Sequence, residues 1–135
     1  MSRSGYSDDC CGWDLVRWRG AVASAIRGKR GQEFLKELLA ALEAMPKKEL
    51  IAYHLAEGGQ FCAIGVVGGK RGVDMDGFDE FDRDEVAGIF NIAPALVAEI
   101  AFMNDEAGWY DEQPEARWHR MRQWVSDQII KQEGG

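Results

Sequence analysis

The sequence predicts a mainly α-helical fold: a compact single domain of about five to six helices, with room for one short strand or hairpin near residues 49–62. The length of 135 residues suits one domain. Apolar residues recur at three- and four-residue steps along much of the chain, which is the spacing of one helix face. Proline and glycine separate these stretches and mark where one element stops and the next begins.

Two helices are predicted in the first third of the chain. The first runs from about Gly12 to Ile26 and is ended by the basic, glycine-containing segment 27–31, which suits a helix C-terminus. Its apolar stripe is Leu15, Trp18, Val22 and Ile26. The second runs from about Gln32 to Met45 and stops at Pro46. Its predicted buried face is Phe34, Leu35, Leu38, Leu39, Leu42 and Met45.

The segment from residue 47 to residue 70 is harder to assign. Residues 47–57 fit either a short helix or a short strand, and Gly58-Gly59 breaks whatever precedes it. Residues 60–70 are mostly small, and we expect them to form a helix. A glycine inside a helix costs about 1 kcal/mol relative to alanine. We therefore expect Gly65 to permit the close approach of another backbone.

The second half of the chain predicts an acidic loop over residues 72–83 and three more helices. Helices are expected over 83–90 and 94–103, with a turn between them, and from Pro114 to about Lys131. The inner face of the last helix is Trp118, Met121, Val125 and Gln128/Ile129, with Trp124 beside it. The resulting organisation is a flexible N-terminal arm at 1–11, one helical domain at 12–131 and a tail at 132–135.

The net charge of −7 is unevenly distributed. Residues 1–40 carry seven Lys/Arg and five Asp/Glu, residues 41–115 carry five and sixteen, and residues 116–135 carry four and two. An acidic middle segment repels phosphate, which argues against a broad nucleic-acid contact and suits a partner protein with a basic surface.

Cysteine usage and hydropathy predict a cytoplasmic protein. Cys10, Cys11 and Cys62 are an odd number with an adjacent pair, which is a poor disulfide framework, so we expect free thiols in a reducing compartment. The N-terminal residues lack the apolar stretch of a signal peptide, and no run approaches the ~18 apolar residues of a membrane span.

Residues 85–100 have the rhythm of a helix-turn-helix. A DNA-binding helix needs donors for base edges and phosphates, yet residues 94–103 contain no Lys, Arg or Gln and no Asn. We expect a structural helical hairpin. A nucleic-acid-binding regulator that uses the hairpin at 84–103 stays as an alternative.

The acidic loop resembles a calcium loop only in part. Asp74, Asp76 and Glu85 stand at the first, third and twelfth places of an EF-hand loop, but the fifth is Phe78 and the sixth is Asp79. We expect no metal and no cofactor. Instead we expect the loop to contact a basic partner, with two aromatic residues as further contact candidates. The predicted contact residues are Asp74, Asp76, Asp79, Glu80, Asp82, Trp109 and Tyr110.

The spacing of Cys and His does not predict a zinc site, because no Cys-x-x-Cys or His-x-x-x-His occurs. Cys62 could act as a nucleophile beside His54 or His119. Its small neighbours favour a buried structural cysteine. An enzyme or small-ligand binder around Cys62 and Asp105 stays as an alternative.

Two short pieces carry a resemblance. They are Cys62-Ala-Ile-Gly65, and Asn104-Asp105 followed by Pro114-Glu-Ala-Arg-Trp118. Their order resembles that of small uncharacterised phage and prophage proteins, and of related bacterial domains, with a Cys-x-x-Gly followed about forty residues later by Asn-Asp. The resemblance covers roughly residues 13–130. It implies a helical fold and a mobile-element setting, and no particular reaction.

The residues give these motifs a structural meaning. A helix that begins near Gln60 leaves its first amides unpaired, and Asn104 or Asp105 could accept from them. The predicted clasp therefore consists of Cys62, Gly65, Asn104 and Asp105. For function, we expect a non-enzymatic phage accessory protein that binds a host protein, for instance to inhibit a defence or replication component.

Overall fold

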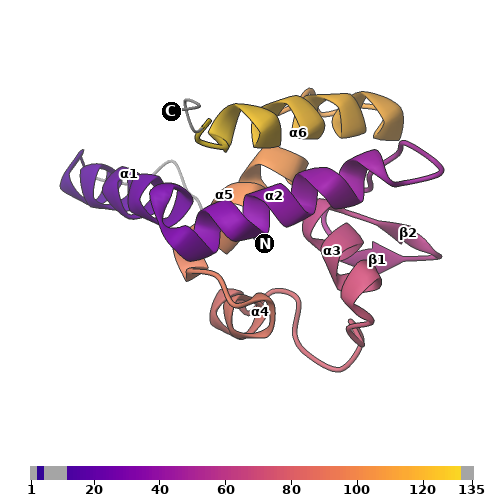
Figure 1. The fold of residues 1–135 in the computed structure, drawn as a ribbon, viewed down its shortest axis with the longest axis horizontal. Coiled ribbons are helices and arrows are strands. Elements are labelled where there is room, and N and C mark those ends of the chain that lie inside the picture. The colour runs from indigo at the N-terminus through magenta and orange to yellow at the C-terminus, as the bar shows by residue number, and fades with distance from the viewer. Residues whose placement is uncertain (1–2, 5–11, 132–135) are drawn as a thin grey trace.

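The structure is a computed structural model that describes residues 3–4 and 12–131. Its elements are α1 (Gly12–Arg27), α2 (Lys29–Glu43), β1 (Ala56–Glu57), β2 (Gln60–Phe61), α3 (Ala63–Arg71), α4 (Arg83–Phe90), α5 (Pro94–Asp105) and α6 (Pro114–Gln128) (Figure 1). This confirms the predicted fold class, a mainly helical bundle with one short hairpin. The expected tail at 132–135, Cys10, Cys11 and most of the expected arm at 1–11 lie outside the described residues.

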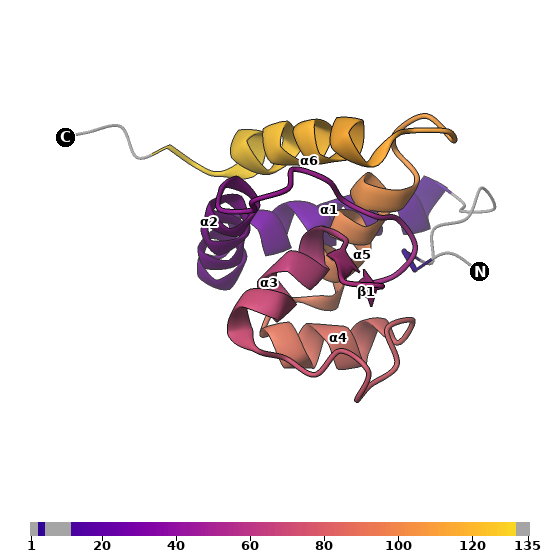
Figure 2. The ribbon, with the colours of Figure 1, turned by 90° about the vertical axis from the view of Figure 1, so that its right-hand side faces the viewer.

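Helix α5 forms the centre of the bundle. It contacts α1, α3, α4 and α6, while α2 packs against α1, α3 and α6. In Figures 1 and 2, α6 lies at the top of the molecule and α4 at the bottom, with α5 between them. This position agrees with the largely apolar sequence of α5, since a helix in contact with four others has little solvent-facing surface to keep polar.

The core combines side chains from α2, α3, α4, α5 and α6, and Val22 of α1 is buried as well. Leu35, Leu38 and Leu42 line the buried face of α2, as the sequence predicts, and Phe34 meets Phe90 of α4 edge to face at 6.2 Å between ring centroids. The largest fully buried side chains are Phe90, Leu35, Leu38, Leu42, Leu50, Leu55, Ile64, Leu96, Ile100, Met121, Val67 and Val86.

Helix α2 begins at Lys29, earlier than the predicted start at Gln32, and only Gly28 separates it from α1. The predicted break is confirmed, because α1 ends at Arg27, one residue after the predicted Ile26, but it is Gly28 alone rather than the segment 27–31. Gly31 makes this sharp junction possible: a Cβ at this position would lie 1.8 Å from the backbone oxygen of Ala25. Read from sequence, Gly31 indicates a break between helices, and the predicted start of the second helix at Gln32 was wrong for that reason.

The ambiguous stretch at 47–57 is mostly irregular rather than helical, with bends at 52–55, and it ends in strand β1. β1 pairs antiparallel with β2 through a two-residue turn, Gly58-Gly59, in which both glycines have positive φ. Residues 60–61 are thus strand, so the helix expected from about Gln60 begins at Ala63. The strand hydrogen bonds compete for these residues and delay the helix by three positions.

The remaining helix ends shift slightly from the predicted ones. α5 continues to Asp105 rather than ending near Met103, and α6 ends at Gln128 rather than near Lys131. Among the described residues no single helix is long and apolar enough to cross a bilayer; α4 and α5 reach that length and composition only as a pair bent by 105°.

Candidate functional site

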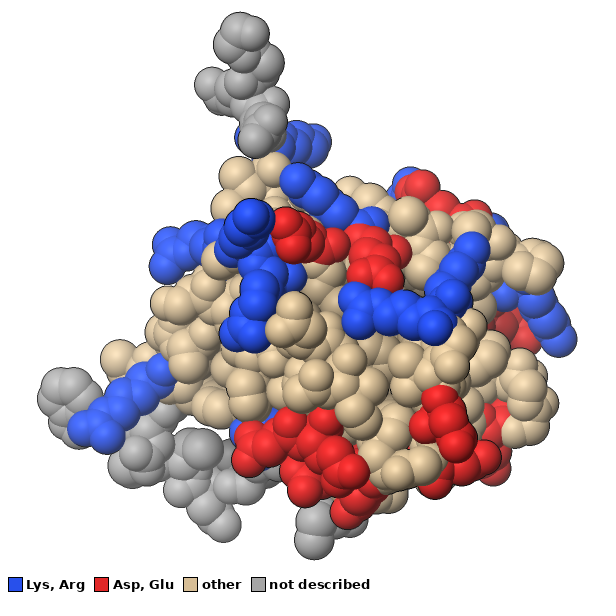
Figure 3. Space-filling model, turned by 60° about the horizontal axis from the view of Figure 1, so that its bottom comes forward, with Lys and Arg blue, Asp and Glu red and all other residues tan. Residues whose placement is uncertain are grey.

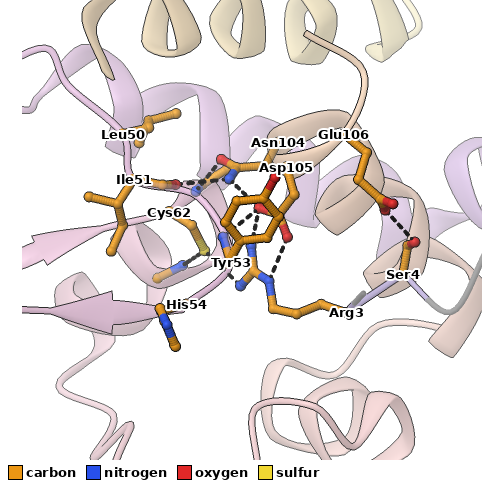
Figure 4. A network of polar contacts seen from close by, with 12 residues as sticks. Arg3, Ser4, Leu50, Ile51, Tyr53, His54, Cys62, Asn104, Asp105 and Glu106 are labelled. Carbon is orange, nitrogen blue, oxygen red and sulfur yellow. Dashed lines mark hydrogen bonds and ion pairs between the residues drawn. The ribbon is translucent and has the colours of Figure 1, made fainter. Parts of the chain in front are cut away.

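The C-terminal end of α5 gathers the motif residues into one polar cluster (Figure 4). Asn104 is buried, and its side chain bridges two segments: Oδ1 accepts from the backbone N–H of Ala63 at 3.1 Å, and Nδ2 donates to the oxygen of Ile51 at 2.9 Å. Asn104 therefore accepts from the first turn of α3, as the clasp hypothesis proposed, and it also fixes the irregular segment before β1.

Asp105 performs a different task from the one considered for it. Its carboxylate does not accept from α3. It accepts from the backbone N–H of Tyr53 at 2.9 Å and from Nδ2 of Asn104 at 2.8 Å. Tyr53 has a φ of +73°, which a tyrosine rarely adopts, so this hydrogen bond offsets local backbone strain. The Asp105 side chain is only 2% exposed, and a carboxylate at such a place requires cationic or N–H partners.

Cys62 is the N-cap residue of α3, where its Sγ accepts from the N–H of Gly65 at 3.5 Å. Gly65 permits a close approach, as expected, but the approaching backbone belongs to Leu55 and not to α5. A Cβ on Gly65 would lie 1.8 Å from the oxygen of Leu55, which itself accepts from the N–H of Cys62 at 3.1 Å. The Cys-x-x-Gly spacing thus places a helix cap at Cys62 and a close backbone contact at Gly65, one turn later.

Arg3 completes the cluster, and the sequence reasoning missed it. Its guanidinium donates twice to Asp105, from Nε at 2.8 Å and from Nη2 at 2.6 Å, and Nη1 lies 3.4 Å from Sγ of Cys62. The Arg3 side chain is 3% exposed. Burial by itself would lower the pKa of Arg3, but the charges of Cys62 and Asp105 and their hydrogen bonds outweigh it and raise the pKa above its ordinary value.

The opposite side of the α5 end is held by two arginines of α6. Buried Arg117 donates to the backbone oxygens of Asn104 at 3.0 Å and Leu50 at 2.9 Å. Arg120 donates to the oxygens of Met103 and Asn104, so the last carbonyls of α5 are capped by cations, which also complement the helix dipole. The piece Pro114–Trp118 of the resemblance therefore converges on the same place as its other motifs.

Glu112 ties the two arginines together. It accepts from Arg120 at 2.7 and 2.8 Å and lies 3.4 Å from Nε of Arg117, with a side chain 6% exposed. The hydrogen bonds from Arg120 lower the pKa of Glu112 more than burial raises it, and the charges of Arg120 and Arg117 lower it further. The loop between α5 and α6 is consequently fixed at its end by a buried ionic contact.

The histidines do not join this cluster. Nδ1 of His54 lies 2.6 Å from Glu80 and Nε2 lies 3.5 Å from Glu57, and in Figure 4 its ring points away from Cys62. His119 stacks edge-on against Trp118. Within residues 3–4 and 12–131, neither histidine bonds to Cys62, and no group of three or more His, Cys, Asp or Glu side chains could hold a metal ion. A Cys–His nucleophile pair is therefore not assembled among them.

The acidic loop is exposed and locally ordered. Oδ1 of Asp74 accepts from the N–H of Asp76 at 3.1 Å, and Oδ1 of Asp79 accepts from Phe81 at 2.9 Å. Asp82 caps α4 by accepting from Glu85 at 3.1 Å. Met75 and Phe78 pack against the core and anchor the loop. Of the predicted contact residues in the loop, Glu80 alone has an ion-pair partner among the described residues, namely His54.

Charge is segregated on the face that includes this loop. In Figure 3, Lys and Arg side chains cover much of the upper part and Asp and Glu gather mostly along the lower part, the side on which Figure 1 places α4 and the acidic loop. The acidic surface is thus a local feature and not merely an average over the chain.

Trp109 and Tyr110 lie in the loop between α5 and α6 and are the most exposed large apolar side chains described, at 84% and 99%. The loop between α5 and α6 lies at the top of the molecule in Figures 1 and 2, whereas the acidic loop lies at the bottom. The two sets of predicted contact residues therefore do not form one continuous surface.

The α4–α5 hairpin is built for packing. The helices meet at 105°, within the range of helix-turn-helix motifs, but α5 occupies the core position described above. Its buried residues are Ala95, Leu96, Val97, Ala98, Ile100, Ala101 and Asn104. A helix enclosed in this way presents no free face to a DNA groove.

An open groove of about 420 Å³ lies elsewhere, between the end of α2, the hairpin and α3. Its walls are largely apolar and include Met45, Phe61 and Val66, with Lys47 and Lys70 at its margin. Cys62 and Asp105 do not line it, so the small-ligand alternative and this groove concern different places.

Comparison with protein-family models, with curated proteins and with solved structures found no match for this chain.

Proposed function

We propose that this protein is a non-enzymatic binding protein whose partner is a host protein with a basic surface, contacted through the acidic segment at residues 74–85. In its finer form the proposal is a cytoplasmic accessory protein of a phage or prophage, acting on a defence or replication component of the host. The Cys-x-x-Gly and Asn-Asp motifs support the mobile-element setting through their resemblance to phage and prophage proteins.

The observation that carries the proposal is the uncompensated charge of the loop. Asp76, Asp84 and Glu85 are exposed, and among the described residues their side chains have no hydrogen bond or ion pair. Asp84 and Glu85 belong to the first turn of α4, and the loop before it, which carries Asp76, is held in shape by the aspartate turns and by Met75 and Phe78. A preformed surface with free carboxylates favours rapid encounter with a basic partner and loses little conformational entropy on binding.

Affinity capture from the lysate of a candidate host tests the proposal when matched variants are compared. The triple variant Asp76→Asn, Asp84→Asn, Glu85→Gln removes one charge from the loop and two from the first turn of α4, and it leaves the Asp74 and Asp79 turns and the Asp82 cap in place. The matched control Glu33→Gln, Glu115→Gln, Asp127→Asn removes three exposed charges from α2 and α6.

We expect a basic protein that is captured by the wild-type chain and by the control, and is lost with the loop variant. Its purified complex should weaken as salt rises, because exposed charges are screened over about 10 Å at 0.1 M salt. Equal capture by both triple variants, or a complex insensitive to salt, would refute the acidic loop as the contact surface.

A further inference from the structure

The guanidinium of Arg3 has an acceptor for each of its three nitrogens. Nε and Nη2 donate in parallel to the two oxygens of Asp105, and Nη1 faces Sγ of Cys62. Two parallel bonds to a carboxylate match the planar fork of a guanidinium, and a lysine ammonium cannot reproduce them. The geometry therefore recognises arginine specifically and not positive charge in general.

The residue that follows Arg3 is held as well. Oγ of Ser4 donates to Oε2 of Glu106 at 2.6 Å, and Ser4 is completely buried. Figure 4 shows the two contacts side by side at the end of α5. Two consecutive carboxylates, Asp105 and Glu106, thus bind two consecutive side chains, which gives the pocket a preference for the order Arg-Ser.

The acceptors of this pocket are positioned by contacts that do not involve Arg3. Asp105 is oriented by Asn104 and by the N–H of Tyr53, and Sγ of Cys62 is oriented by the N–H of Gly65. Arg3 reaches Cys62 across 59 positions of sequence and Asp105 across 102. The pocket is therefore a site in its own right, and Arg3 stands in it as a ligand would.

We propose that the pocket formed by Cys62, Asp105 and Glu106 is a binding site for an Arg-Ser segment. Arg3 and Ser4 fill it as an internal ligand, and an Arg-Ser segment of a partner protein fills it by displacing them. The exchange is non-covalent: the hydrogen bonds of Arg3 and Ser4 with the pocket break, and the partner's Arg-Ser segment forms the same hydrogen bonds in their place. It uses other residues than the acidic loop, so each proposal can fail without the other.

A labelled peptide of residues 1–6, Met-Ser-Arg-Ser-Gly-Tyr, tests the site by fluorescence anisotropy. We expect the full chain with Arg3→Ala to bind this peptide with saturation. The wild-type chain should bind at least about tenfold more weakly, because its own Arg3 competes. A peptide with lysine in place of the arginine should also bind about tenfold more weakly, since the loss of one charged hydrogen bond is worth about that factor. Adding Asp105→Asn to Arg3→Ala should abolish binding.

A second route covers the case in which Arg3→Ala does not fold. A protease site placed within residues 6–11 lets the wild-type chain fold first and be cut afterwards. Residues 1–5 should then exchange with added peptide. The proposal is overturned if the folded Arg3→Ala chain or the cut chain fails to bind the peptide. It is equally overturned if the lysine peptide binds as well as the arginine peptide, or if the wild-type and Arg3→Ala chains bind equally.

Discussion

The two acidic regions of this protein hold their carboxylates in opposite ways. At the end of α5, Asp105 is 2% exposed and accepts four hydrogen bonds from Arg3, Tyr53 and Asn104. In the acidic loop, Asp76 is exposed and accepts none among the described residues. The same residue type is structural in the first place and available to a partner in the second. Sequence composition does not separate them, but the number of donors around each carboxylate does.

Gly65→Ala should have the largest effect on stability. The added Cβ would lie 1.8 Å from the oxygen of Leu55, so the backbone must shift where α3 meets the segment before β1. We expect the free energy of unfolding to fall by about 3 kcal/mol, as for a severe overpacking. Gly77→Ala in the acidic loop is the matched control, because its nearest neighbour would be 3.4 Å away, and it should cost less than about 1 kcal/mol. If urea titrations show that both variants lose the same free energy of unfolding, the difference between the two glycine positions is refuted.

Asp105→Ala should have an effect of similar size. It leaves the buried guanidinium of Arg3 without its partner, which costs about 3 kcal/mol when the cation cannot reach water. We expect the melting temperature to fall by roughly 10 °C. Asp76→Ala removes the same group from the acidic loop and should stay within about 0.5 kcal/mol. A similar melting temperature for both variants would show that Asp105 is not the buried hub described above.

Glu112→Gln should cost about 1 kcal/mol at pH 7, because the charged hydrogen bonds with Arg120 are lost. The pKa of Glu112 is lower in the folded chain than in the unfolded chain. Its charge therefore stabilises the fold above the ordinary glutamate pKa of about 4.3, and this advantage disappears as pH falls through the lowered pKa. Urea titrations of both chains from pH 7 to pH 3 should converge; a difference that grows toward acid would contradict the assignment.

Arg3→Ala should also change the reactivity of Cys62 while leaving the acidic loop unaffected. With Cys10 and Cys11 replaced by serine, Cys62 is the single thiol, and it is 1% exposed with Arg3 against its Sγ. We expect slow labelling by a thiol reagent in the presence of Arg3 and faster labelling without it. Identical labelling rates in two folded chains would show that Arg3 does not cover the thiol.

The sequence carried most of the fold, because periodic apolar residues and proline or glycine boundaries are local signals. It failed at Gly31 and at Gln60-Phe61, where a tertiary contact and a strand pairing overrode those signals. It located Asn104 and Asp105 as a clasp and named the first amides of α3 as their donors, which holds for Asn104 but not for Asp105. Arg3 in particular has no local signal, since one arginine in a polar stretch looks like any other. A buried carboxylate needs a cation as its partner, but the sequence does not show that Asp105 is buried. The structure is therefore needed to see that an arginine must lie beside it.

A double-mutant cycle between Arg3 and Asp105 tests the central contrast most directly. The free energies of unfolding of the wild-type chain, Arg3→Ala, Asp105→Ala and the double variant are measured by urea titration in the full chain. We predict a coupling energy of at least about 1.5 kcal/mol, the value of a hydrogen-bonded charge pair. A coupling within about 0.5 kcal/mol of zero, the scatter expected for independent sites, would contradict it. The carboxylate of Asp105 would then gain no more from its partner than the exposed carboxylates of the acidic loop do.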